Sequence, residues 1–260
     1  MGSQALVRIW VLGELRVTRR DGTDVRVEEW RTGKTRDLLR LLAFGDGRPL
    51  RPDSLAELLW PDVASHRARN RLRTAVSQIR VTLGDQSVER HPDGYLLKDA
   101  VLDAHQFATL ATLTDLAMDR RDYAAVLRLI RAAERLYRDD FHADDDDSPW
   151  ALAERTRLQH LRRSMVGEAA EAALHEDHPR EALSFATLAV ELDPMNETAL
   201  RLLMRAHAAR GEVAAALRDF EEYRTRLAEE LGVDPSPETR ALHLKLLRES
   251  STNLAGLAEP

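Results

Sequence analysis

A basic segment at residues 66–84, HRARNRLRTAVSQIRVTLG, carries five arginines and no acidic residue, although the formal net charge of the 260-residue chain is −6. Guanidinium groups bind phosphate, and arginine, asparagine, threonine, serine and glutamine side chains form hydrogen bonds with base edges in the major groove of DNA. No acidic residue stands one helical turn away to neutralise these arginines. The segment therefore predicts binding to double-stranded DNA. The alternative is an arginine-rich surface helix without a ligand, whose arginine stems cover apolar surface.

A helix over His66 to Leu83 would have two different faces. At 100° per residue the apolar side chains form one stripe, which we expect to be buried: Ala68, Leu72, Ala75, Val76, Ile79 and Leu83. The polar side chains opposite are the expected base-reading contacts: Arg67, Asn70, Arg71, Thr74, Ser77 and Gln78. Positive side chains at the flanks and near the start of an earlier helix are the expected phosphate contacts: Lys34, Arg36, Arg69, Arg73 and Arg80.

Short strands and helices are predicted around this segment. Residues 7–30 alternate apolar and polar side chains in three bursts, VRIWVLG, ELRVT and DVRVEEW, which predict three strands. The apolar period becomes helical from Thr35, and a second short helix, SLAELLW, follows Asp53 and Ser54, either of which is a suitable N-cap. After the basic segment, SVERHPDGYLLKD predicts a hairpin about a Pro-Asp-Gly turn.

From about residue 104 onward the sequence predicts only helices. The amphipathic stretches lie near residues 105–118, 122–138, 149–175, 179–192, 196–210, 213–231 and 237–249. The triplet Glu181-Ala182-Leu183 corresponds to Ala215-Ala216-Leu217 after 34 residues, which is the period of tetratricopeptide repeats. We therefore expect three parts: a DNA-binding domain at 1–104, a tetratricopeptide-like helical domain at 105–250 and a flexible tail at 251–260.

Charge is divided unevenly between these parts. Residues 1–106 contain 18 basic and 15 acidic residues, whereas the remainder contains 20 basic and 29 acidic residues. Only the first part is therefore expected to bind a polyanion. The chain contains no cysteine, which suits a reducing cytoplasm, and no window approaches the roughly 20 apolar residues of a membrane span. We expect a soluble cytoplasmic protein with no membrane contact.

Three motifs resemble chemical sites but lack essential residues. RTGKT resembles the end of a phosphate loop, but that motif needs a glycine five residues before Gly33, where Glu28 stands. The run Asp144 to Asp147 lacks the alternating ligands and central glycine of a calcium loop, so a solvated loop is expected. HEDH, with His175 and His178, has no cysteine partners for zinc. We therefore expect no metal, no cofactor and no enzymatic activity.

Longer segments resemble a known family. The order of strands, three helices and a hairpin, with ELLWPD ahead of the basic helix, is similar to the winged helix-turn-helix domain of OmpR-class response regulators. SPWALAERTRLQHLR, LDPMNETALRLLMRAH and LAEELGVDPSPETR closely resemble the bacterial transcriptional activator domain. Over residues 5–249 the chain therefore resembles the small, two-domain form of the Streptomyces antibiotic regulatory protein family.

This resemblance implies a fold and a function. The implied fold is mainly α with a small β component, a winged helix-turn-helix domain followed by an all-α repeat domain. The implied function is transcriptional activation of a biosynthetic gene cluster, with His66 to Leu83 as recognition helix on direct repeats in promoters, and Arg90 and His91 in the wing. RNA polymerase holoenzyme, through its sigma factor, and a second copy on tandem repeats are the implied partners. The alternative is a helical-repeat adaptor or sensor that primarily binds a peptide or small molecule.

Overall fold

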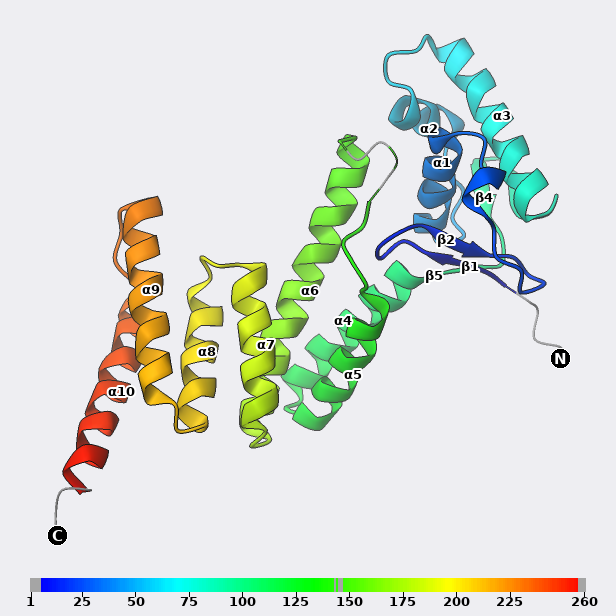
Figure 1. Cartoon of the computed structure of the whole chain (residues 1–260). Helices are drawn as coiled ribbons and strands as arrows, with labels where there is room; N and C mark the ends of the chain where they lie inside the picture. The colour runs from blue at the N-terminus through cyan, green and yellow to red at the C-terminus, as the bar shows by residue number, and fades with distance from the viewer. Residues whose placement is uncertain (1–5, 143, 145–146, 257–260) are drawn as a thin grey trace. The chain divides into compact units, whose positions relative to one another are not determined.

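A computed structural model describes residues 6–142, 144 and 147–256. Strands are confined to the first part of this range and helices dominate the rest, so the predicted class, mainly α with a small β component, is confirmed (Figure 1). The chain forms two compact units. The first unit combines residues 1–109 with 133–160, and the second combines residues 110–132 with 161–260. Helices α4 to α6, described below, contribute to both.

A small sheet in the first unit has the strand order β2-β1-β5. Strand β1 (Val7–Trp10) pairs antiparallel with β2 (Arg16–Thr18) and parallel with β5 (Ala100–Leu102). Its alternating pattern buries Val7 and Ile9 and leaves Arg8 exposed, as the pleat of a half-buried strand requires. Two strands are thus correctly predicted from the opening bursts of the sequence, and β5 is an additional strand.

The third predicted strand, DVRVEEW, is wrong. Its residues Val27–Glu29 form a 3-10 helix, η1, and only Asp24 bridges to Thr18. The carboxylate of Glu29 accepts a hydrogen bond from the backbone N–H of Arg26 at 2.9 Å and pairs with Arg19. These contacts satisfy the polar groups of a tight turn and so compete with strand pairing.

Three helices follow the first two strands: α1 (Gly33–Phe44), α2 (Pro52–Leu59) and α3 (Ser65–Leu83). Thr32 caps α1, because its hydroxyl accepts a hydrogen bond from the backbone N–H of Thr35. The prediction that Asp53 or Ser54 caps α2 is wrong. The helix begins at Pro52, whose fixed φ and missing N–H suit the first helical position, and both residues lie within its first turn.

The apolar stripe predicted for the basic segment is confirmed, since its six members are all buried on α3: Ala68, Leu72, Ala75, Val76, Ile79 and Leu83. The predicted hairpin is also confirmed as β3 (Val88–His91) and β4 (Gly94–Leu97), with Arg90 opposite Tyr95. Gly94 has a positive φ, and a Cβ there would lie 2.0 Å from the carbonyl oxygen of Leu50, so the hairpin needs glycine at this position.

Seven helices complete the described part of the chain: α4 (Asp103–Asp119), α5 (Tyr123–Leu136), α6 (Pro149–His175), α7 (Pro179–Leu192), α8 (Glu197–Ala209), α9 (Val213–Leu231) and α10 (Pro237–Gly256). Helix α10 continues beyond its predicted end at residue 249. Residues 257–260 of the predicted tail lie outside the described residues.

Neighbouring helices of the second unit stack in sequence order. Helix α8 packs against both α7 and α9, and these three helices lie side by side (Figure 1). Small side chains line the contacts of α6 to α8, including Ala173, Ala182, Ala186 and Ala206. Alanine lets helix axes approach closely, so each helix pair buries its apolar face on its neighbour, as in a helical repeat.

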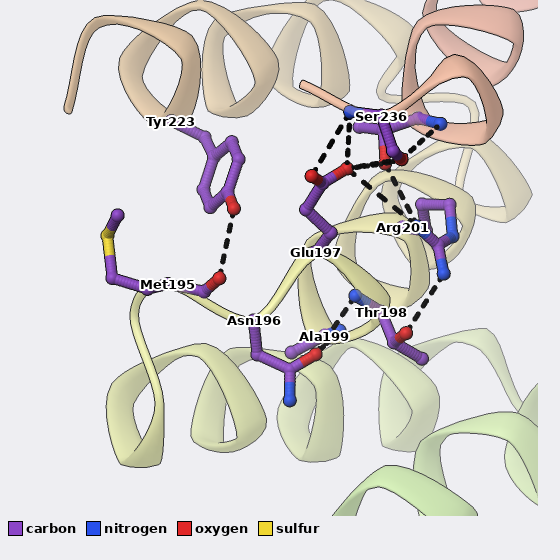
Figure 2. Close-up of polar contacts among 9 residues, drawn as sticks. Met195, Asn196, Glu197, Thr198, Ala199, Arg201, Tyr223 and Ser236 are labelled. Carbon is purple, nitrogen blue, oxygen red and sulfur yellow. Dashed lines mark hydrogen bonds and ion pairs between the residues drawn. The ribbon is translucent and has the colours of Figure 1, made fainter. Parts of the chain in front are cut away.

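The two segments most specific to the family resemblance meet in the second unit. Glu197, from LDPMNETAL, accepts hydrogen bonds from the backbone N–H of Ser236 at 2.9 and 3.1 Å and from the hydroxyls of Ser236 and Thr239 in GVDPSPETR (Figure 2). Arg201 donates a further bond to the Thr239 hydroxyl. Nearby, the Tyr223 hydroxyl donates to the carbonyl of Met195. The two segments thus fix the start of α10 against α8.

Candidate nucleic-acid interface

The polar face of α3 is exposed to solvent. Five of the six expected base readers are exposed and Gln78 is half-buried; the exposed five are Arg67, Asn70, Arg71, Thr74 and Ser77. Within the part of the chain that the structure describes, the guanidinium groups of Arg67 and Arg71 form neither a hydrogen bond nor an ion pair. Two unpaired arginines next to neutral polar side chains are suited to bidentate contacts with guanine.

Helix α1 holds the Gln78 side chain through a hydrogen bond. The hydroxyl of Thr35, which is 1% exposed, donates a hydrogen bond to Gln78 Oε1 at 2.7 Å. This bond orients the amide of Gln78 and leaves its Nε2 group as a donor. A glutamine amide fixed in this way loses little conformational freedom when it contacts a base.

The flanking arginines differ in their contacts. Arg69 Nε donates to Asp53 of α2 at 2.6 Å, which raises the pKa of Arg69, and both side chains are more than half exposed. Arg73 Nη1 donates to Asn70 Oδ1 at 3.3 Å. Arg80 Nε donates to the carbonyl of Val88 at 3.0 Å and so ties α3 to the hairpin. A phosphate contact from each of these arginines stays a prediction.

Two hollows flank the exposed face of α3. One, of about 460 Å³, is lined by Lys34, Asn70, Arg71 and Thr74 among others, so Lys34 lies beside the expected base readers. The other, of about 400 Å³, is lined by residues that include Arg31, Arg73, Thr74, Ser77 and Val81.

Arg31 and Val81 line the second hollow but were not among the residues predicted to contact DNA. Val81 is 80% exposed and follows Ser77 by one helical turn, a spacing that continues the polar face. Arg31 stands directly before the capped start of α1, a position that a contact prediction restricted to helices overlooks.

The hairpin carries two further expected contacts. Arg90 Nη1 donates to the hydroxyl of Tyr95 at 2.9 Å, and its guanidinium lies 5.3 Å from the centre of that ring. The Nδ1 atom of His91 accepts a hydrogen bond from the backbone N–H of Asp93 at 3.2 Å. The guanidinium of Arg90 is therefore pre-oriented across the hairpin. Its role as a wing contact stays a prediction.

Arg36 of α1 does not lie on the polar face of α3. It is paired with Asp144, the first residue of the acidic run. The guanidinium of Arg36 binds the carboxylate of Asp144 within the first unit, so it is occupied by protein. Burial raises the pKa of Asp144, but hydrogen bonds from Arg36 and Arg40 outweigh that effect and hold the pKa below its ordinary value. Asp144 and Asp147 both lie in an exposed loop, as predicted, although the carboxylate of Asp144 is paired with two arginines; Asp145 and Asp146 lie outside the described residues.

Two motifs from the sequence remain, RTGKT and HEDH. The Gly33-Lys34 pair begins α1, and His175 stacks on Tyr123 with ring centres 4.3 Å apart. Among the described residues, no group of three or more histidine or carboxylate side chains is placed to hold a metal ion. In that same range, no helix combines the length and the apolar character needed to span a bilayer.

Comparison with known proteins gives a family. Residues 102–247, more than half of the chain, match the family model described as bacterial transcriptional activator domain. The regulatory protein AfsR of Streptomyces coelicolor is 28% identical over 85% of this chain, which spans 23% of AfsR. The transcriptional regulatory protein EmbR of Mycobacterium tuberculosis is 29% identical over 92% of this chain, and the transcriptional regulator RedD of S. coelicolor is 23% identical over 94%.

A solved structure supports the fold. Mycobacterium tuberculosis EmbR, in complex with a low affinity phosphopeptide, matches with a TM-score of 0.81 and 26% identity over 94% of this chain and 65% of EmbR. This chain spans about a quarter of AfsR and under two thirds of EmbR. The relatives are transcriptional regulators, and the match to the family model covers the helical part. The chain therefore belongs to the Streptomyces antibiotic regulatory protein family and carries its bacterial transcriptional activator domain.

Proposed function

We propose that this protein is a sequence-specific DNA-binding transcriptional activator without enzymatic activity. It binds direct repeats in promoter DNA through α3, and the β3–β4 hairpin contacts the adjacent backbone as a wing. The observation that carries the proposal is the exposed face of α3, where Arg67 and Arg71 have no partner in the described chain and lie beside Asn70, Thr74 and Ser77. Positive and amide side chains together supply both phosphate binding and base reading.

The two parts of the chain have different roles in this proposal. The acidic balance after residue 106 disfavours a second DNA surface, so the helical repeats are assigned to protein contacts. RNA polymerase holoenzyme, through its sigma factor, and a second copy on the adjacent repeat are the proposed partners. The proposed targets are promoters of a biosynthetic gene cluster, and the proposed location is the cytoplasm, at the nucleoid.

A selection of genomic DNA fragments by the purified chain, followed by anisotropy titrations of the enriched site and a random duplex, tests this proposal. We expect tighter binding of the enriched site and, for both duplexes, a steep loss of affinity with salt, because phosphate contacts release counterions. No duplex binding at moderate salt would refute the proposal and would favour an adaptor or sensor built on the helical repeats.

A further inference from the structure

The carboxylate of Asp144 is held by two arginines of α1. Arg36 Nε donates to the two carboxylate oxygens at 3.0 and 2.8 Å, and Arg36 Nη2 also donates to Oδ1. Arg40 Nη1 bridges Asp144 at 2.6 Å and Asp37 at 2.8 Å. The backbone N–H of Asp144 donates in turn to Asp37 at 3.0 Å. Two carboxylates and two guanidinium groups therefore form one connected network, which we call the Asp144 cluster.

This cluster is closely packed as well as paired. The side chains of Asp37 and Arg40 are 0% and 6% exposed, and the Nε group of Arg40 has no hydrogen-bond partner among the described residues. A Cβ on Gly33 would lie 2.9 Å from the Cβ of Asp144, so the glycine allows the acidic residue to approach the start of α1. Removing one member of a partly buried charge network leaves its partners uncompensated, so we expect the intact cluster to hold these two turns of α1 in place.

The same two turns of α1 support the polar face of α3 from their other side. Gly33, Arg36, Asp37 and Arg40 face Asp144, whereas Thr35 lies about 200° from Gly33 around the helix and donates to Gln78. The first two turns of α1 thus contact the segment between α5 and α6 on one side and the side chain of Gln78 on the other. Helix ends fray unless they are tied down, so the Asp144 cluster and the Thr32 cap together hold Thr35 in place.

We propose that Asp144 is a positioning residue for base reading, which acts through the first turn of α1 on the amide of Gln78. This inference rests on the proposed function, since it assigns a control of sequence preference to the same DNA-binding face. It predicts that a change at Asp144 lowers sequence specificity but not phosphate binding. The reason is that Asp144 does not contact Gln78 directly: it contacts α1, on the side of that helix away from α3.

The Asp144→Asn variant of the full chain tests this proposal, with Asp147→Asn as the matched control. Both variants remove one negative charge from the same acidic run, but Asp147 is exposed and forms no hydrogen bond or ion pair with the described residues. Anisotropy titrations compare an enriched site with a random duplex over a salt series. We expect Asp144→Asn to reduce the ratio of the two affinities roughly tenfold, as for loss of one bidentate base contact, with an unchanged salt slope. Asp147→Asn should keep the ratio of the unmodified chain.

A second pair of variants separates positioning from loss of fold. Arg36→Lys keeps the positive charge and leaves the Arg40–Asp144 bond in place, but it loses the planar guanidinium fork. It should therefore give a smaller loss of specificity than Asp144→Asn, in a chain that is still folded. Combining Asp144→Asn with Gln78→Ala should cost no more specificity than Gln78→Ala alone, because both act on one contact. Thermal melts establish the temperature range in which each variant is folded.

Three results would overturn the inference. They are equal behaviour of Asp144→Asn and Asp147→Asn, equal losses on enriched and random duplexes, or additive losses in the double variant. If the unmodified chain binds no duplex at all, the proposed function itself fails, and that outcome is distinct from the other three.

Discussion

Phe141 connects two distant stretches of the first unit, and its removal should destabilise that unit. Its side chain is 0% exposed, and its ring lies edge-on to Phe44 of α1 at 5.3 Å and tilted to Trp150 of α6 at 5.9 Å. Its backbone forms a bridge with Leu12, and its carbonyl accepts a hydrogen bond from Arg155 at 2.8 Å. Phe141→Ala therefore opens a cavity at a point where three elements meet.

The expected cost follows from the contacts that are lost. Truncating a buried phenylalanine to alanine costs about 3–5 kcal/mol, a value that includes both transfer and cavity effects. The two aromatic pairs place Phe141→Ala in the upper half of this range, because each pair contributes about 0.5–1.5 kcal/mol beyond its buried area. A domain of this kind is stable by only about 5–15 kcal/mol. The variant should therefore lose a large fraction of the free energy of unfolding of the first unit.

Urea unfolding followed by tryptophan fluorescence measures this effect, because Trp150 lies beside the substituted ring. Leu58→Ala on α2 is the control, since it also shortens an apolar side chain in the first unit but Leu58 is 40% exposed. A shift below about 1 kcal/mol for Phe141→Ala, or one equal to that of Leu58→Ala, would refute the packing described here.

Three further predictions concern helix α3 and the half-buried acid Glu168. Leu72→Ala should cost about 2–5 kcal/mol, and an unchanged melting temperature would mean that α3 packs with a different face. Arg71→Ala should cost about 1–3 kcal/mol on the enriched site only, whereas Arg73→Ala should weaken all duplexes and reduce the salt slope by roughly one; equal, sequence-independent losses would contradict this distinction. Burial, followed by the neighbouring Asp115, raises the pKa of Glu168 from 4.5 to about 7. The protonated acid therefore adds stability that is present below pH 4.5 and is lost as the pH rises towards 7. Glu168→Gln should therefore reduce the slope of melting temperature against pH. Equal slopes for the variant and the unmodified chain would contradict this.

Local periodicity was enough to predict the long elements. The apolar stripe through Leu72 and Ile79 has a helical period over many residues, and α3 buries it as expected. The hairpin was predictable because Pro92, Asp93 and Gly94 between two apolar stretches are typical of a tight turn. Short elements were harder to predict. The alternation in DVRVEEW is typical of a strand, but the side chain of Glu29 caps a 3-10 helix there.

Contacts between distant residues could not be read from the sequence. Strand β5 exists because Val101 pairs in parallel with Arg8, and three residues alone give no strand signal. Arg36 looked like a phosphate contact because of its charge and its place near a helix start. Its bond to Asp144, 108 residues later, is a consequence of packing. The exposure of the polar face of α3 depends on one helix alone and could be predicted, whereas the bonding partners of the neighbouring arginines could not.

The first unit has consequences for protein synthesis, because it is made of two stretches separated by residues 110–132. When residue 109 has just left the ribosome, neither Phe141 nor Asp144 has emerged, so α1 lacks its ring partner and its carboxylate partner. At roughly 5–20 residues per second, the missing stretch arrives several seconds later. The nascent first unit therefore stays incomplete, with Phe44 lacking its contact with Phe141, and it reaches its final form only while the helical repeats are being synthesised.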